Sequence, residues 1–292
     1  MISYNPKQWL LALIRFNRTD TIRRLFPVIL GVGAYAFCVA YLEMEVWKLS
    51  ADSLVKNVSI MHTLLGFVIS FTLVFRTNTA YERWWEGRKL WGSLVNNSRN
   101  LAMKIAAILP PEHPDRLFFR RIIPTYATVL KNHLRSEETR IELFDDLPAS
   151  VRERLDLKKH VPNQVASAMI GHIQDLYRKG ELSGEQLLYL NGEITAFTDI
   201  CGACERIKNT PIPYSYGVFI KKFLFFYILT LPFGYVFSLG YFVVPIVAFI
   251  FYVLASLELI AEEIEEPFGS DENDLPLSRL SHNIKNHVEE LV

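Results

Sequence analysis

The sequence predicts an all-α membrane protein that combines four transmembrane helices with a large cytoplasmic helical region. The first observation is that Asp, Glu, Lys and Arg are absent from three long stretches, 25–42, 57–75 and 223–257. The second is that the rest of the chain carries apolar residues at helical spacing, without any run of strand-type alternation. About 20 apolar residues cross the hydrocarbon core of a bilayer as a helix, so the first two stretches predict one crossing each.

The third charge-free stretch is long enough for two helices. Pro232, Gly234, Gly240 and Pro245 interrupt it, and because Gly and Pro favour turns we expect a short bend near 234–240. The predicted transmembrane helices therefore lie at about 25–45, 57–78, 217–236 and 240–260. The helical region 79–216 and the C-terminal segment 261–292 are expected to lie outside the membrane.

Lys and Arg flank these helices unevenly. Five basic residues between positions 7 and 24 precede the first helix, whereas the loop after it contains only Lys48 and Lys56. Basic residues also follow the second helix and precede the third. Because Lys and Arg accumulate on the cytoplasmic side of a membrane, we expect a multi-pass protein of the cell membrane with both termini and the region 79–216 in the cytoplasm.

The region 79–216 contains local signals for helices. Apolar residues recur at helical spacing between 165 and 176, and Ser183 with Gln186 has the form of a capping box that opens a helix at 184. Cys201 and Cys204 form a CxxC without a second Cys or His pair, which favours structural thiols over a zinc or redox site. No enzyme motif is present, and with a net charge of +0 we expect neither catalysis nor nucleic-acid binding.

The second predicted membrane helix carries an aromatic stripe. Phe67, Phe71 and Phe75 recur every four residues and so share one face. Polar residues continue this face at both ends of the stripe: Ser59, Thr63 and Asn78. Two interpretations are open, namely ordinary helix packing and the hydrophobic constriction of a pore.

His62 lies in the same helix. An ionisable side chain at this depth points either to a water-lined face or bundle interior, or to a hydrogen bond with a neighbouring helix near the outer interface. The sequence leaves both possibilities open.

Three segments resemble the bestrophin family in its bacterial form. They are 75–92, which begins Phe-Arg-Thr-Asn-Thr-Ala-Tyr-Glu-Arg-Trp-Trp-Glu; 202–213, with Gly-Ala-Cys-Glu-Arg-Ile and Thr-Pro-Ile-Pro; and 266–277, with Glu-Pro-Phe-Gly and Asn-Asp-Leu-Pro-Leu. They occur in the family's order, and the resemblance covers nearly the whole of 1–292 as one channel unit. It implies a homopentamer with four membrane helices per subunit, a cytoplasmic helical vestibule and a pore lined by the second helix.

The resemblance also implies positions for the pore constrictions. It places the neck at Phe67, Phe71 and Phe75 and a cytoplasmic aperture on or next to Glu185. Ser59, Thr63 and Asn78, which lie on the same helix face as the stripe, would then line the pore beside the neck. A ring of glutamates at the aperture would favour cations such as sodium. The alternative is that Glu185, in the first turn of a helix, interacts with the helix dipole.

A calcium site is the one cofactor that the resemblance suggests. Asp271 and Asp274 match the position at which animal bestrophins bind calcium, and carboxylate oxygens suit that ion. However, Glu263 and Glu266 occupy positions that are uncharged in the calcium-binding relatives. We expect no cofactor by default; without calcium, Asp274 would cap the following helix or pair with a basic residue.

The expected function is passive conduction of small monovalent ions through a homopentameric channel in the lipid bilayer. Chloride is the family's default ion, and a sodium-selective channel with a Glu185 ring is the alternative. The alternative from another class is a non-conducting membrane scaffold, in which the phenylalanine stripe packs against other helices.

Overall fold

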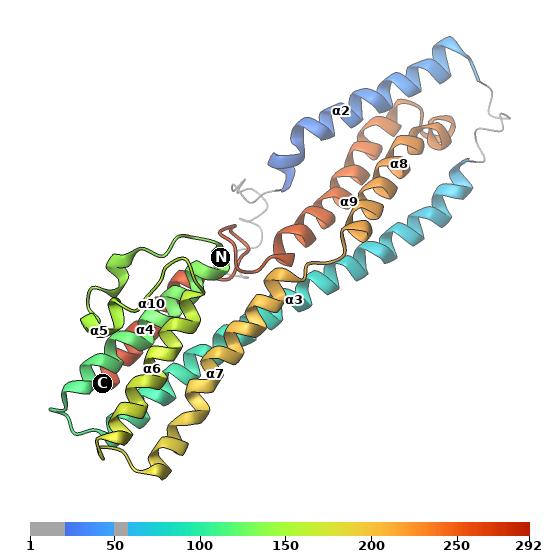
Figure 1. Cartoon of the computed structure of the whole chain (residues 1–292). Coiled ribbons are helices and arrows are strands. Elements are labelled where there is room, and N and C mark those ends of the chain that lie inside the picture. Colours follow the sequence, from blue (N-terminus) through green and yellow to red (C-terminus); the bar gives the residue numbers. More distant parts are fainter. Residues whose placement is uncertain (1–20, 50–57) are drawn as a thin grey trace. The chain divides into compact units, whose positions relative to one another are not determined.

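A computed structural model describes residues 21–49 and 58–292 (Figure 1). Within these residues the secondary structure consists of helices, without a β-strand, which confirms the all-α prediction. The chain divides into two compact units. Among the described residues, we call 21–49 and 58–83 together with 211–265 the apolar unit, and 84–210 together with 266–292 the amphipathic unit.

Four helices of the apolar unit lie within the described residues. They are α2 (Thr21–Tyr41), which ends in a π-helical turn at Leu42–Val46, the first part of α3 (Val58–Ile108), α8 (Tyr214–Leu239) and α9 (Val243–Glu265). Their facing sides form one apolar cluster that includes Leu73 on α3, Ile220 on α8 and Val247 on α9. Three helical stretches of the described chain are long and apolar enough to cross a membrane, Thr21–Val46, Val58–Ile108 and Tyr214–Glu265.

The third of these stretches contains the bend that the sequence predicted. A short 3₁₀ turn at Gly240–Phe242 separates α8 from α9, and the two helices then lie side by side (Figure 1). Gly240 has φ +54°, a conformation that favours glycine. Pro232 and Gly234 lie inside α8 instead of ending it. A Cβ at Gly234 would come within 2.9 Å of the Ser59 backbone nitrogen, so glycine permits α8 to approach α3 closely.

Helix α3 continues past the expected membrane boundary at 78 without a break. It ends at Ile108, shortly before Pro110 and Pro111, which cannot extend a helix. Its first part therefore belongs to the apolar unit and its remainder to the amphipathic unit.

The amphipathic unit packs the second part of α3 with five further α-helices and a 3₁₀ turn. These are α4 (Pro114–Arg135), the 3₁₀ turn Ile141–Phe144, α5 (Ala149–Arg152), α6 (Val161–Arg178), α7 (Gly184–Asn209) and α10 (Leu277–Leu291). Their apolar faces bury large side chains such as Trp91, Tyr126 and Phe197. The stripe predicted on α6 is buried, and the capping box of Ser183 and Gln186 opens α7; both predictions are confirmed.

The candidate pore helix and its buried ion pairs

One face of α3 presents three phenylalanine side chains. Phe67, Phe71 and Phe75 are 72, 55 and 52% exposed in the single chain. Their rings form a continuous row, with centroids 6.0 Å apart between Phe67 and Phe71 and 4.7 Å apart between Phe71 and Phe75. The structure therefore places all three candidate neck residues on one uncovered face of one helix.

The core-facing stripe of α3 explains why this face is uncovered. Ile69, Leu73 and Arg76 are all at most 4% exposed and follow one another at helical spacing. A residue two positions away on a helix points about 200° round the axis. Phe67 and Phe71 are thus directed away from the side of α3 that packs within the apolar unit.

The other candidate lining residues continue the phenylalanine row. Thr63 and Asn78 are exposed, and Ser59 is partly buried. The Thr63 hydroxyl donates a hydrogen bond to the Ser59 carbonyl oxygen at 3.1 Å, so its own helix satisfies that donor. The face is consequently apolar in the middle and polar at each end.

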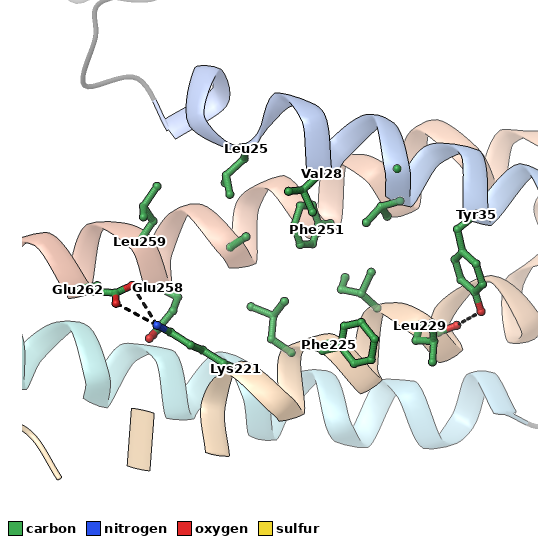
Figure 2. A pocket seen from close by; sticks show the side chains of 15 residues that line it. Leu25, Val28, Tyr35, Lys221, Phe225, Leu229, Phe251, Glu258, Leu259 and Glu262 are labelled. Atoms are coloured by element: carbon green, nitrogen blue, oxygen red, sulfur yellow. Dashed lines mark hydrogen bonds and ion pairs between the residues drawn. The ribbon is translucent and has the colours of Figure 1, made fainter. Parts of the chain in front are cut away.

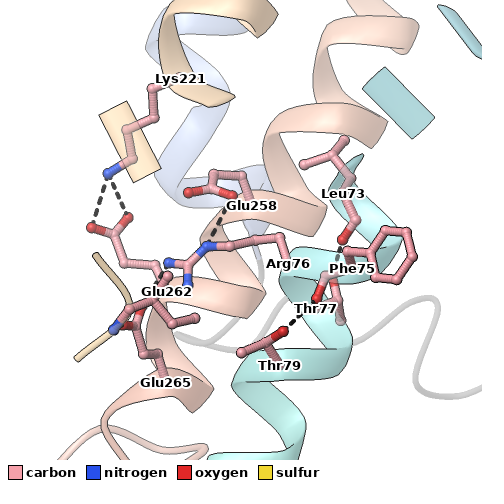
Figure 3. Close-up of polar contacts among 10 residues, drawn as sticks. Leu73, Phe75, Arg76, Thr77, Thr79, Lys221, Glu258, Glu262 and Glu265 are labelled. Atoms are coloured by element: carbon pink, nitrogen blue, oxygen red, sulfur yellow. Dashed lines mark hydrogen bonds and ion pairs between the residues drawn. The ribbon is translucent and has the colours of Figure 1, made fainter. Parts of the chain in front are cut away.

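Arg76 comes immediately after Phe75 and is only 4% exposed. Its Nη2 lies 2.6 Å from a carboxylate oxygen of Glu265, and its Nε lies 3.6 Å from Glu258, both on α9 (Figure 3). The other oxygen of the Glu265 carboxylate accepts the backbone N–H of Ile212 at 2.7 Å. These contacts hold α3 against α9 and the start of the 211–213 segment at the Phe75 end of the phenylalanine row.

This network was not predicted from the sequence. There, Arg76 stands out only as part of the bestrophin-like segment 75–92 and as a basic residue that follows the second predicted membrane helix. One signal was available. Arg76 shares the spacing of Ile69 and Leu73, so it lies on the core-facing stripe and needed a buried carboxylate partner. Nothing in the sequence identifies Glu258 and Glu265 as that partner.

His62 is fully buried and joins α3 to α8. Its Nδ1 lies 2.8 Å from the Val58 carbonyl oxygen and its Nε2 lies 2.9 Å from the Thr230 hydroxyl. The Tyr227 and Tyr235 rings pack beside it. Of the two possibilities that the sequence left open, the structure shows the hydrogen bond to a neighbouring helix.

Glu185 occupies the exposed first turn of α7. The Ser183 hydroxyl donates a hydrogen bond to its carboxylate at 2.7 Å. This bond, together with one from its own backbone N–H, lowers the pKa of Glu185, so the side chain is negatively charged at neutral pH. Whether several copies form a ring remains a prediction.

The two candidate calcium ligands differ in environment. Asp274 is 2% exposed, and one of its carboxylate oxygens accepts the backbone N–H of Asp271 at 2.7 Å. Its other oxygen has no hydrogen-bond partner, and burial raises the pKa of Asp274 to about 6. Asp274 is not the cap of α10, which begins after Pro276 without a side-chain cap.

No third carboxylate converges on Asp271 and Asp274 among the residues described. The pair alone supplies fewer oxygen ligands than calcium takes in proteins. Backbone carbonyl oxygens and water would have to complete the coordination, so a calcium site at Asp271 and Asp274 stays an untested prediction.

A cluster of His133, His160 and Glu205 does bring three possible metal ligands together. However, Nδ1 of His160 accepts a hydrogen bond from the Asn163 N–H at 3.2 Å, so Nε2 carries the proton of the neutral ring and donates a hydrogen bond to Glu205 at 2.7 Å. His133 contacts the same carboxylate oxygen at 2.6 Å. Burial alone would raise the pKa of Glu205, but these two hydrogen bonds lower it overall. Hydrogen bonding therefore accounts for the cluster.

Cys201 and Cys204 are buried in the core of the amphipathic unit. Burial is the main reason that the pKa of Cys201 rises to about 12, and it also raises the pKa of Cys204. Both thiols are consequently protonated at neutral pH, as expected of structural cysteines.

Comparison with known proteins gives consistent matches over most of the chain. The family model described as Bacterial/Fungal Bestrophin protein matches residues 1–290. The voltage-dependent anion channel-forming protein of Synechocystis sp. (strain PCC 6803) is 31% identical over 99% of this chain and 94% of its own length. A protein of the same description from Nostoc sp. (strain PCC 7120) is 37% identical over 77% of this chain and 75% of its own length. The solved structure of a bacterial bestrophin homolog from Klebsiella pneumoniae matches with a TM-score of 0.82 and 27% identity, over 93% of this chain and 98% of the other. With its signature segments and a family-model match over residues 1–290, the chain belongs to the bacterial and fungal bestrophin family.

Proposed function

We propose that this protein is a pentameric anion channel, in which copies of α3 line a central pore. The observation that carries the proposal is the uncovered phenylalanine row of α3. The Synechocystis and Nostoc relatives are described as anion channel-forming proteins, which supports an anion as the conducted ion. Conduction through such a pore is passive and needs no chemical step.

A pore-facing position explains the composition of this face better than a lipid-facing one. A face directed at lipid would be apolar throughout the membrane, whereas the row of phenylalanines continues into exposed Thr63 and Asn78. Polar side chains at both mouths of a constriction contact water and ions. The phenylalanines between them form the dry part of the path.

In this proposal Phe67, Phe71 and Phe75 form the neck that gates the channel. Rings of aromatic side chains close a narrow pore by excluding water, and rotation or widening lets it fill. The positive edges of the aromatic rings can face a passing anion. A chloride-conducting neck therefore needs no fixed positive charge at this depth.

The four apolar helices α2, α3, α8 and α9 serve as the four crossings of each subunit in the cell membrane. The Lys and Arg bias supports cytoplasmic termini and a cytoplasmic amphipathic unit. Glu185 lies in this unit, and its negative charge would oppose anions if five copies formed an aperture. We propose that the neck, rather than Glu185, sets the sign of the conducted ion.

Flux from liposomes under a potassium chloride gradient tests two proposals: that the channel conducts anions, and that the neck rather than Glu185 sets the sign of the conducted ion. We expect a reversal potential close to that of chloride, and Glu185→Ala should raise anion permeability further if the aperture ring exists. A reversal potential at the cation value in the unmodified protein would overturn the anion assignment. Light scattering of the purified protein tests the assembly, since a monomer rules out the pore.

The neck is tested by replacing Phe67, Phe71 and Phe75 together with alanine, which should increase chloride flux. The matched control replaces three other exposed phenylalanines outside α3 with alanine: Phe219, Phe226 and Phe249. We expect no increase in flux from the control. Equal flux in both triple variants would refute the neck assignment, and absence of flux in every variant would favour the non-conducting scaffold.

A further inference from the structure

A pocket of about 490 Å³ opens between α2, α8 and α9 within the apolar unit (Figure 2). Its volume lies in the range of about 300–1,000 Å³ that is typical of small-molecule sites. Most of its wall is apolar and includes Val28 on α2, Ile228 on α8 and Phe251 on α9. A ligand in it must therefore be largely hydrocarbon.

The charged groups of the pocket gather at one end. Lys221, Glu258 and Glu262 lie together there, whereas Tyr35 and Leu229 lie at the opposite end (Figure 2). Glu258 and Glu262 come from the last two turns of α9, where the apolar stretch ends. The pocket is thus amphipathic along its length, as a membrane lipid is, with its polar end at the level where lipid headgroups lie.

The charges at the polar end do not balance. Two carboxylates, Glu258 and Glu262, face one ammonium, Lys221, whose Nζ lies 3.0 and 3.1 Å from the Glu262 oxygens. The Glu258 side chain is only 7% exposed, and neither of its oxygens has a hydrogen-bond partner. Arg76 is 3.6 Å away, but it is shared with Glu265, which it contacts at 2.6 Å. Glu258 therefore lacks a donor of its own.

We infer that this pocket binds a membrane lipid with an ammonium headgroup. A primary ammonium has three N–H donors and one positive charge, and Glu258 has neither a hydrogen-bond donor nor a cation of its own. The acyl chain would lie along Val28, Ile228 and Phe251. A zwitterionic aminophospholipid also carries a phosphate that suits Lys221. This inference does not depend on ion conduction.

Lipid retention by the purified full-length protein tests the inference. The protein in detergent is mixed with equal amounts of phosphatidylethanolamine, phosphatidylcholine and phosphatidylglycerol with identical acyl chains, and bound lipid is counted by native mass spectrometry. We expect phosphatidylethanolamine to be retained about tenfold over phosphatidylglycerol. Phosphatidylcholine should be intermediate, because its quaternary ammonium has charge but no N–H donor.

Two charge variants and a control test the headgroup contact. Glu258→Gln should abolish the preference for phosphatidylethanolamine, and Glu262→Gln, at a half-exposed position, should reduce it. Glu263→Gln is the matched control, because Glu263 lies on the same helix but pairs with Arg24 and does not line the pocket. If Glu258→Gln and Glu262→Gln both kept the preference for phosphatidylethanolamine, the headgroup assignment would be overturned. Because there are two variants, poor folding of one still leaves the other as a test.

Gly31→Leu tests the position of the acyl chain. Gly31 lines the pocket, and a Cβ there meets no atom within 4 Å, so the larger side chain enters the empty space without disturbing α2. Retention of all three lipids should fall. Unchanged retention in this variant, or no retained lipid in the unmodified protein, would show that lipid does not occupy the pocket.

Discussion

Replacing Arg76 with glutamine is expected to destabilise the protein strongly. The substitution leaves Glu258 and Glu265 as buried carboxylates, with side chains 7 and 14% exposed. Removal of one partner from a buried ion pair costs about 3–5 kcal/mol, since the remaining charge is desolvated without compensation. We expect a loss in this range, because Arg76 is the partner of two carboxylates.

Lys221→Gln is the control for this prediction. Lys221 and Glu262 form an ion pair at 3.0 Å, but both side chains are 53% exposed. Exposed pairs contribute about 0–1 kcal/mol. Unfolding by increasing mole fractions of dodecyl sulfate in mixed micelles, at one fixed protein concentration, measures both variants on the same scale.

A double variant identifies the cause of the loss. Adding Glu265→Gln to Arg76→Gln removes one of the two uncompensated charges and should recover more than about 1 kcal/mol of the stability that the single variant loses. If Arg76→Gln cost no more than Lys221→Gln, or if Glu265→Gln made it worse, buried charge would not be the determinant and the reasoning would be refuted.

Three further predictions concern the amphipathic unit. Asp274→Asn should stabilise the protein at pH 7 by up to about 3 kcal/mol, since burial raises the pKa of Asp274 from 3.8 to about 6 and the folded state disfavours its charge. This gain should vanish as the pH falls from 6 to below 4, where the aspartate is neutral in both folded and unfolded chains; a gain that persists at pH 3 in unfolding experiments would contradict it. Cys201 and Cys204 should resist iodoacetamide until the protein unfolds, as peptide mass spectrometry can show, whereas labelling in the native state would disprove their protonated burial. Ser183→Ala should cost about 0.5–2 kcal/mol through loss of the capping box, and Ser183→Asp should restore most of that in the same unfolding assay.

Local features of this protein were predictable from the sequence. The absence of charge over long stretches specifies membrane helices, because a bilayer has no water to solvate polar groups. The four-residue spacing of Phe67, Phe71 and Phe75 specifies a common face, because helix geometry is the same everywhere. The capping box at Ser183 involves only residues three apart, so its bonds form in any fold that contains the helix.

Contacts between distant segments were not predictable in this way. Arg76, Glu258 and Glu265 each resemble ordinary flanking charges in the sequence, and only the packing of α3 against α9 makes them a buried network. The amphipathic pocket likewise exists because α2, α8 and α9 leave space between apolar side chains and bring Lys221 beside two carboxylates. The low exposure of Asp274 depends on how its loop folds back on itself.

The sequence by itself thus determined that the chain is helical, which segments are apolar enough to enter a membrane, and which face of the second membrane helix carries aromatic rings. Only the tertiary structure decided that this face is uncovered within its own chain, that the arginine beside it is buried, and that one carboxylate lacks a donor. The physical reason is that helical periodicity and hydropathy are properties of residues a few positions apart, so they can be recognised in the sequence alone. Burial and charge compensation depend instead on neighbours that the fold brings together from far along the chain.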